Sequence, residues 1–180
     1  MRKILVVVDM QNDFIDGSLG TKEAQAIVDA VERKIITEMA NGALVVFTRD
    51  THSDNYENTL EGKNLPVRHC IYKTHGWEIY HKLQKFIDSD PRSIVWDKPT
   101  FGSKDLACFI EGNEPDEVEL VGLCTDICVL SNAILAKAAW PEAVVSVDAH
   151  CCAGVTPESH RTALEAMKMC QIVIRNEANE

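Results

Sequence analysis

Three residues that together could hydrolyse an amide or an ester follow apolar runs of the chain. Asp9 ends the run in "VVVDMQNDF", Lys98 follows "VWD", and Cys128 closes "GLCTDIC". A carboxylate can accept a proton, an ammonium group can stabilise a thiolate, and a thiolate can attack a carbonyl carbon to form a thioester. These three residue types are sufficient for covalent hydrolysis if the fold brings them together.

The two cysteines of "CTDIC" could bind a metal together or form a disulfide. Alternatively, either one could be a buried apolar side chain or a catalytic thiol. The chain has seven cysteines, an odd number, and no CxxC pair, so neither a disulfide framework nor a zinc ribbon is expected. Cys128 falls in the first turn of a predicted helix, where the helix N-terminus lowers a thiol pKa and offers N–H groups to an oxyanion. We therefore predict that Cys128 is the reactive thiol and that the Cys124 side chain is a packed, unreactive one.

A second group of residues could hold a metal ion. Asp50 and His52 stand in "RDTH" at the end of another apolar run, and His69 follows in "LPVRHC". Carboxylate and imidazole ligands suit zinc, iron or manganese with coordination positions left open. Surface loops are also rich in both residue types, so spacing alone leaves the site undecided. The stretch 49–75 is the longest irregular segment, and long loops in compact domains are usually functional.

Short apolar runs alternate with helical patterns along the chain, which predicts a βαβ series with right-handed crossovers. Continuous apolar runs are typical of strands covered on both faces. The sequence therefore predicts one α/β domain over residues 1–180, a Rossmann-like three-layer open parallel sheet of about six strands with helices on both faces. In such sheets ligands bind beyond the carboxyl ends of the strands. The predicted strands are 3–8, 43–48, 93–96, 117–122, 143–147 and 170–174, and the predicted helices are 22–39, 76–87, 103–112, 126–138 and 157–169.

Composition excludes several classes of partner. The formal net charge of −10 and the lack of clustered Lys and Arg argue against a nucleic-acid surface. The N-terminal apolar run stops at Asp9, too early for a signal peptide, and no segment approaches the roughly 18 apolar residues of a membrane helix. We expect a cytoplasmic protein with no nucleic-acid or membrane partner.

Six motifs occur in an order shared with a known family. They are "DMQNDF", "RDTH", "HCIYKTHGWEI", "KPTFGSKDL", "GLCTDICV" and "VDAHCCAG". Over nearly its whole length the chain resembles the isochorismatase-like cysteine hydrolases, and among them most closely the nicotinamidases. Several motifs in the right order are far more specific than any one of them.

The resemblance implies a role for each of the catalytic candidates. Asp9 would carry the thiol proton to the departing ammonia, Lys98 would stabilise the thiolate, and Cys128 would attack the carbonyl. It also implies a cis peptide bond before Cys124, with the backbone N–H groups of Cys124 and Cys128 forming the oxyanion hole.

The resemblance further implies a metal cofactor. Asp50, His52 and His69 match the positions that bind a divalent metal, zinc first, with iron or manganese as alternatives. That ion would bind the pyridine nitrogen of the substrate and orient its ring.

The reaction implied by the resemblance is hydrolysis of nicotinamide to nicotinate and ammonia. The alternatives are an amidase for a carbamoyl or ureido substrate, a vinyl-ether hydrolase of the isochorismatase kind, and an inactive binding module on the same fold. Phe14 matches a pocket aromatic, whereas Leu65 and Pro66 stand where nicotinamidases carry a Trp, and Trp77 is the candidate replacement. Family members commonly form dimers or tetramers, so we expect a homo-oligomer.

Overall fold

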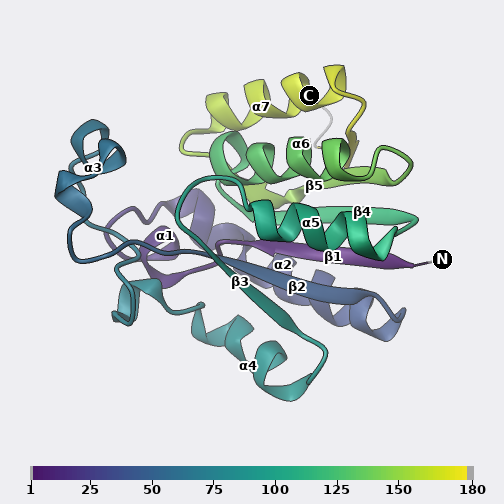
Figure 1. The fold of residues 1–180 in the computed structure, drawn as a ribbon, viewed down its shortest axis with the longest axis horizontal. Helices are drawn as coiled ribbons and strands as arrows, with labels where there is room; N and C mark the ends of the chain where they lie inside the picture. The colour runs from purple at the N-terminus through teal and green to yellow at the C-terminus, as the bar shows by residue number, and fades with distance from the viewer. Residues whose placement is uncertain (1, 178–180) are drawn as a thin grey trace.

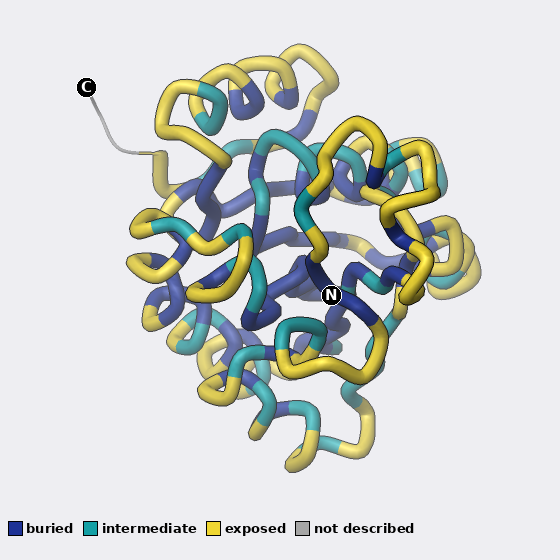
Figure 2. The backbone as a smooth tube through the Cα atoms, turned by 90° about the vertical axis from the view of Figure 1, so that its left-hand side faces the viewer, coloured by how far each residue is buried: buried dark blue, intermediate teal, exposed yellow. Residues whose placement is uncertain are grey.

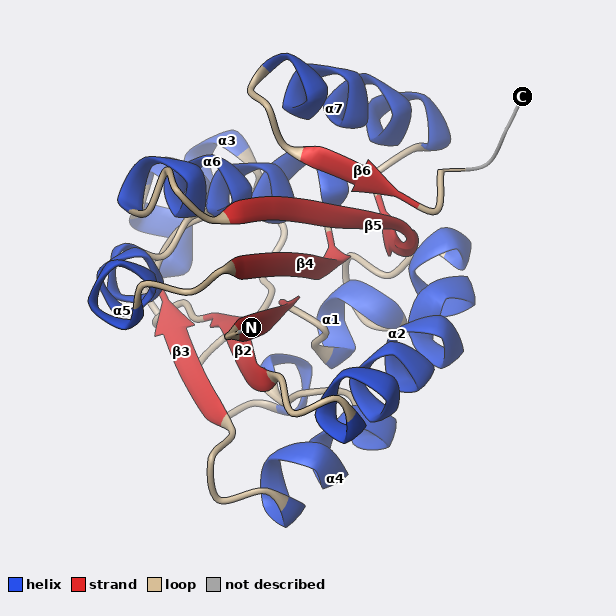
Figure 3. Ribbon diagram, turned by 90° about the vertical axis from the view of Figure 1, so that its right-hand side faces the viewer, coloured by secondary structure: helices blue, strands red, loops and turns tan. Residues whose placement is uncertain are grey.

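The computed structural model describes residues 2–177 and forms a six-stranded, open, entirely parallel sheet between two layers of helices (Figures 1 and 3). The strand order is β3-β2-β1-β4-β5-β6, and the predicted fold class is thus confirmed. The strands are β1 (Lys3–Val8), β2 (Leu44–Asp50), β3 (Ile94–Lys98), β4 (Glu117–Leu123), β5 (Val144–Ala153) and β6 (Val173–Arg175).

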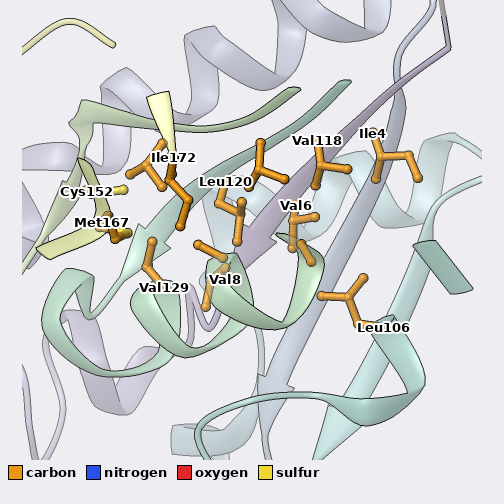
Figure 4. Close-up of a cluster of buried hydrophobic side chains, with 14 of the residues drawn as sticks. Ile4, Val6, Val8, Leu106, Val118, Leu120, Val129, Cys152, Met167 and Ile172 are labelled. Carbon is orange, nitrogen blue, oxygen red and sulfur yellow. The ribbon is translucent and has the colours of Figure 1, made fainter. Parts of the chain in front are cut away.

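Helices cover both faces because the central strands are apolar on both. In β1, Leu5 and Val7 face the layer of α2 (Lys22–Ala40) and α4 (His81–Ser89). Ile4, Val6 and Val8 face the layer of α5 (Lys104–Asn113), α6 (Leu130–Ala139) and α7 (Pro157–Met169) (Figure 4). Successive strand side chains point to opposite faces, so a continuous apolar run is what a doubly covered strand requires.

The topology brings distant segments to one edge. The chain builds β1, β2 and β3 in one direction and then returns to place β4 on the other side of β1. All carboxyl ends lie on the left in Figure 1, the side that faces the viewer in Figure 2. Two short helices, α1 (Asn12–Ile15) and α3 (Leu60–Asn64), lie in the loops beyond that edge. Within residues 2–177, no helix is long and apolar enough to cross a membrane.

Several element boundaries differ from the sequence prediction. The fourth helix starts at His81 because His75–Trp77 forms a separate 3-10 turn and Ile79 pairs with Gln11 in an isolated bridge. β5 continues to Ala153 because a register shift in β4 lets its end pair with the end of β5. β6 starts later because Cys170 still caps α7.

Candidate active site

The three catalytic candidates meet at the carboxyl edge of the sheet. Lys98 Nζ lies 2.7 Å from Asp9 Oδ2 and 3.5 Å from Cys128 Sγ. All three residues are buried, with exposures of 0% for Asp9, 1% for Lys98 and 5% for Cys128. Lys98 comes from the edge strand β3, and its side chain extends past β2 to reach the end of β1. A base, a cation and a thiol are thus within reach of one another and shielded from water.

The backbone and Thr48 together position Asp9. Its φ of 47° lies in the left-handed region, which non-glycine residues rarely adopt and which clusters at functional sites. Thr48 Oγ1 donates a hydrogen bond of 2.7 Å to Asp9 Oδ1. The other carboxylate oxygen, Oδ2, faces Lys98.

Burial and the nearby carboxylates disfavour the thiolate form of Cys128. Burial raises its pKa well above the ordinary value, and Asp9 adds to this effect while Lys98 opposes it. One ammonium group faces two carboxylates here, because Asp50 Oδ1 also lies 3.5 Å from Lys98 Nζ. The net direction is thus upward, because burial and the two carboxylates raise the thiol pKa, whereas the helix N-terminus predicted from the sequence acts only to lower it. Burial also raises the pKa of Asp9, which makes its carboxylate a better proton acceptor.

Cys128 belongs to a π-helical turn, Thr125–Val129, that leads into α6. We call this segment the catalytic turn. Cys124 caps its start, and the peptide bond between Leu123 and Cys124 is cis. Asn132 holds the turn from α6 by donating a hydrogen bond of 2.8 Å to the carbonyl of Cys128.

The candidate metal ligands gather beside the triad, with a fourth member that sequence reasoning missed. Asp50, His52, His69 and Glu61 offer ligand atoms that all lie within 4.8 Å of one another. Asp50 Oδ2 is 2.7 Å from His52 Nε2 and 3.4 Å from His69 Nε2, and Glu61 Oε1 is 3.4 Å from His52 Nε2. Glu61 comes from α3, a short polar helix inside 49–75 whose sequence carries no periodic signal.

A buried ligand atom without a hydrogen-bond partner and the spacing of the ligand atoms both fit a divalent cation in this cluster. His52 Nε2 is buried without a hydrogen-bond partner, although a carboxylate oxygen stands beside it. Zinc bonds of about 2.0–2.2 Å place neighbouring ligand atoms about 3.0–3.5 Å apart, close to the spacing seen here. The Nδ1 of His69 lies 2.8 Å from the carbonyl of Val67, an arrangement that turns Nε2 of metal-binding histidines toward the ion.

Neighbouring side chains fix the orientation of these ligands. The Tyr56 ring is fully buried, with its centroid 4.8 Å from that of His52 and 5.1 Å from that of His69. Gln11 binds both backbone groups of Asp50, accepting from its N–H at 2.7 Å and donating to its carbonyl at 2.9 Å. Sequence reasoning missed both residues, although Gln11 lies inside the "DMQNDF" motif.

The predicted pocket residues have different surroundings. Phe14 lies beside the metal-ligand cluster, with its ring centroid 5.6 Å from that of His69. Leu65 caps the C-terminus of α3 and is 39% exposed. Trp77 packs elsewhere: Arg49 stands 3.8 Å over its ring, and its Nε1 donates to Thr51 Oγ1 at 2.8 Å. Of the three, the structure brings only Phe14 into ring contact with the cluster, among the described residues.

An open parallel sheet with a buried carboxylate, ammonium group and thiol at one edge defines a candidate cysteine hydrolase. The isochorismatase domain family model matches residues 3–178. The chain therefore belongs to the isochorismatase family.

Relatives within that family include proteins with named activities. A structure of pyrazinamidase/nicotinamidase from Streptococcus mutans superposes with a TM-score of 0.86 at 31% identity, covering 96% of this chain and 99% of that one. The pyrazinamidase of Pyrococcus horikoshii in complex with zinc gives 0.82 at 30% identity, covering 97% and 98%. The nicotinamidase/pyrazinamidase of Mycobacterium tuberculosis is 27% identical, covering 94% of this chain and 96% of its own. The chain is thus nicotinamidase-like over nearly its full length.

Proposed function

We propose that this protein is an amidohydrolase that cleaves a nicotinamide-like amide through a thioester on Cys128. The observation that carries the proposal is the position of Lys98 Nζ, 2.7 Å from the Asp9 carboxylate and 3.5 Å from the Cys128 sulfur. The names of the similar proteins support the substrate class. Nicotinamide, giving nicotinate and ammonia, is the first substrate to test.

The first half of the reaction forms the thioester. Asp9 takes the proton of the Cys128 thiol as the sulfur attacks the amide carbon, and Lys98 stabilises the anionic sulfur. The carbonyl oxygen becomes an oxyanion, which the backbone N–H groups of Cys124 and Cys128 stabilise. Asp9 then gives the proton to the departing nitrogen, the C–N bond breaks, and ammonia leaves.

The second half releases the acid. A water molecule loses a proton to Asp9 and attacks the thioester carbon, and the C–S bond breaks. The proton on Asp9 returns to the Cys128 sulfur, so the thiol and the carboxylate are regenerated. One water is consumed, and one carboxylic acid and one ammonia are formed.

The metal-ligand cluster would orient the substrate. Asp50, His52, Glu61 and His69 would hold a divalent metal, zinc first, with iron or manganese as alternatives. When bound, the ion supplies a Lewis acid for a ring nitrogen of the substrate. Phe14 would pack against that ring, and Leu65 and Trp77 stay predicted pocket residues. The homo-oligomer also stays a prediction.

Ammonia release from a small amide panel tests the proposal. The panel holds nicotinamide, pyrazinamide and a carbamoyl compound, assayed with wild type, Cys128→Ala and Cys108→Ala, an exposed cysteine that serves as control. We expect turnover of nicotinamide that falls at least about 10⁴-fold in Cys128→Ala and stays unchanged in Cys108→Ala. Turnover that survives in Cys128→Ala would contradict the mechanism. Preferential, metal-independent turnover of the carbamoyl compound would favour the ureido alternative.

A further inference from the structure

The N-terminal part of α7 contacts the catalytic turn although it contributes nothing to the triad or the metal-ligand cluster. Thr125 Oγ1 and His160 Nδ1 lie 2.8 Å apart in a hydrogen bond. The backbone N–H of Val155, just before α7, donates to Asp126 Oδ1 at 3.1 Å. Two consecutive residues of the turn are thus held from one helix terminus.

The Thr125–His160 hydrogen bond joins a fully buried hydroxyl to a half-buried ring. Thr125 is fully buried, and among residues 2–177 its hydroxyl makes no other hydrogen bond. His160 is half-buried, and its backbone lies close to Gly154, the residue after β5, since a Cβ on Gly154 would lie 2.8 Å from the His160 backbone nitrogen. Because Thr125 itself is fully buried, this hydrogen bond constrains its position, and loss of the His160 ring removes that constraint.

Thr125 is placed to transmit that constraint to the oxyanion-stabilising groups. It follows Cys124 directly, and the carbonyl of Cys124 accepts hydrogen bonds of 3.1 Å from both Ile127 and Val129. The turn is therefore one tied unit that carries the N–H groups of Cys124 and Cys128. A shift of Thr125 moves the Cys124 carbonyl to which Ile127 and Val129 are hydrogen-bonded, and so displaces the turn that carries both N–H groups.

We propose that His160 is a positioning residue that acts through Thr125 to aim the backbone N–H groups of the catalytic turn at the developing oxyanion. The inference rests on the proposed function and deepens it. His160 touches neither the substrate nor the reacting atoms. Its loss lowers the rate of acyl transfer while the thiol and the metal-ligand cluster stay in place.

The surroundings of His160 allow its replacement without loss of the fold. A cavity of about 1180 Å³ lies between α2 and α7, and His160, Arg161 and Leu164 form part of its wall. Truncation of His160 enlarges a space that already exists instead of opening a new hole in a packed core. Arg161 lines the same cavity and makes no hydrogen bond to the catalytic turn among the described residues, so Arg161→Ala is the matched control.

The decisive experiment separates oxyanion stabilisation from general damage to the site. His160→Ala and Thr125→Val are each assayed for kcat and KM with nicotinamide, for the rate of Cys128 alkylation by iodoacetamide, and for inhibition by the aldehyde analogue of nicotinamide. Attack on the aldehyde creates an oxyanion, whereas displacement of iodide creates none. We expect kcat to fall about 10- to 100-fold and aldehyde affinity to fall by a similar factor, with KM and the alkylation rate within twofold of wild type.

Two further variants make the result specific. His160→Asn keeps a hydrogen-bonding group near the position of Nδ1 and should restore at least part of kcat. The double variant His160→Ala with Thr125→Val should be no slower than the slower single variant, because both remove the same bond.

Several results would overturn the inference. These are an unchanged kcat in His160→Ala, an alkylation rate that falls together with kcat, additive effects in the double variant, or an equal loss in Arg161→Ala. Failure of the proposed function looks different, because wild type would then release no ammonia or Cys128→Ala would stay active.

Discussion

Two buried ionic clusters lie on the same sheet, and they are built differently. The catalytic cluster comprises Asp9, Lys98, Cys128 and Asp50 at the carboxyl ends of the strands. The second, which we call the ion-pair network, lies between the sheet and α2. The network comprises Lys3, Lys34, Glu38, Glu117, Glu119, Asp148 and Arg175.

Every charge in the centre of the ion-pair network has more than one partner. Glu119 is fully buried, with Lys3 Nζ at 2.6 Å and Lys34 Nζ at 3.1 Å. Asp148 pairs with Lys34 at 2.7 Å and accepts from Asn176 Nδ2 at 2.8 Å. Burial disfavours the Lys34 ammonium group, but Asp148 and Glu119 outweigh burial and raise its pKa.

The catalytic cluster keeps a group whose proton can move. Burial raises the pKa of both Cys128 and Asp9, so the proton lies between a thiol and a carboxylate of altered acidity, with one ammonium group beside them. Perturbed acidity marks functional sites, but structural ion pairs perturb it too. Comparing the two clusters shows that burial of charge alone does not identify a catalytic site. The feature that distinguishes the catalytic cluster is a proton that can move beside a nucleophile.

The largest expected effect is on activity, from Asp9→Asn. The amide keeps the shape of the carboxylate but cannot accept the thiol proton, so kcat should fall about 10³-fold or more. Stability should fall as well, by about 3 kcal/mol, because the fully buried Lys98 loses its partner at 2.7 Å and keeps only Asp50 at 3.5 Å. Ammonia release and urea unfolding measure the two quantities. A kcat within tenfold of wild type would mean that Asp9 is not the base.

Glu119→Gln is the matched change in the ion-pair network, and its effect should fall on stability. Removing one charge from a buried ion pair leaves its partners undercompensated, at a cost of about 3 kcal/mol in unfolding free energy. The catalytic rate should stay within twofold of wild type. Urea unfolding and kcat under identical conditions provide the check. A large loss of kcat without a loss of stability would erase the distinction between the clusters.

Glu61→Gln tests whether the fourth ligand belongs to the metal site. Loss of its charge should weaken zinc binding at least about tenfold, since even outer-shell partners of a metal ligand contribute that much. Competition with a zinc chelator measures the affinity independently of turnover. Glu57→Gln, an exposed residue paired with Arg68, is the control and should bind zinc as wild type does. Equal affinities in all three proteins would remove Glu61 from the site.

The smallest expected effect concerns Cys151, a thiol beside the ion-pair network. Burial, with Asp148 nearby, raises its pKa to about 12. A raised pKa in the folded state stabilises the protein below the unfolded-state pKa near 9, and this contribution is lost as pH rises toward 12. Cys151→Ala should therefore flatten the decline of unfolding free energy above pH 9 by up to about 1.4 kcal/mol per pH unit.

Urea unfolding at pH 8, 9 and 10 measures this slope. Cys170→Ser, which replaces an exposed cysteine, is the control for loss of a thiol. An identical slope in wild type and Cys151→Ala would show that this buried thiol does not contribute to the pH dependence.

Apolar runs and strand ends predict much of the fold and of the site. Strands that are apolar on both faces predict a parallel sheet covered by helices on both sides. Because ligands bind at the carboxyl ends of such strands, the sequence alone predicts that Asp9, Lys98 and Cys128 lie at one edge. The helix that carries Glu61 could not be predicted in this way, because α3 is short, polar and held by contacts of Tyr56 and Thr59. The raised pKa of the Cys128 thiol could not be predicted from the sequence either. It depends on burial and on how many carboxylates share Lys98, which only the structure shows.

The central claim is that the Cys128 sulfur carries the acyl group during turnover. Acid quenching of wild type mixed with nicotinamide, followed by intact-mass and peptide mass spectrometry, tests it most directly. The account predicts a mass increase of one nicotinoyl group, located on the peptide that contains Cys128 and absent in Cys128→Ala. An acyl group on another cysteine, or its presence in Cys128→Ala, would contradict the account.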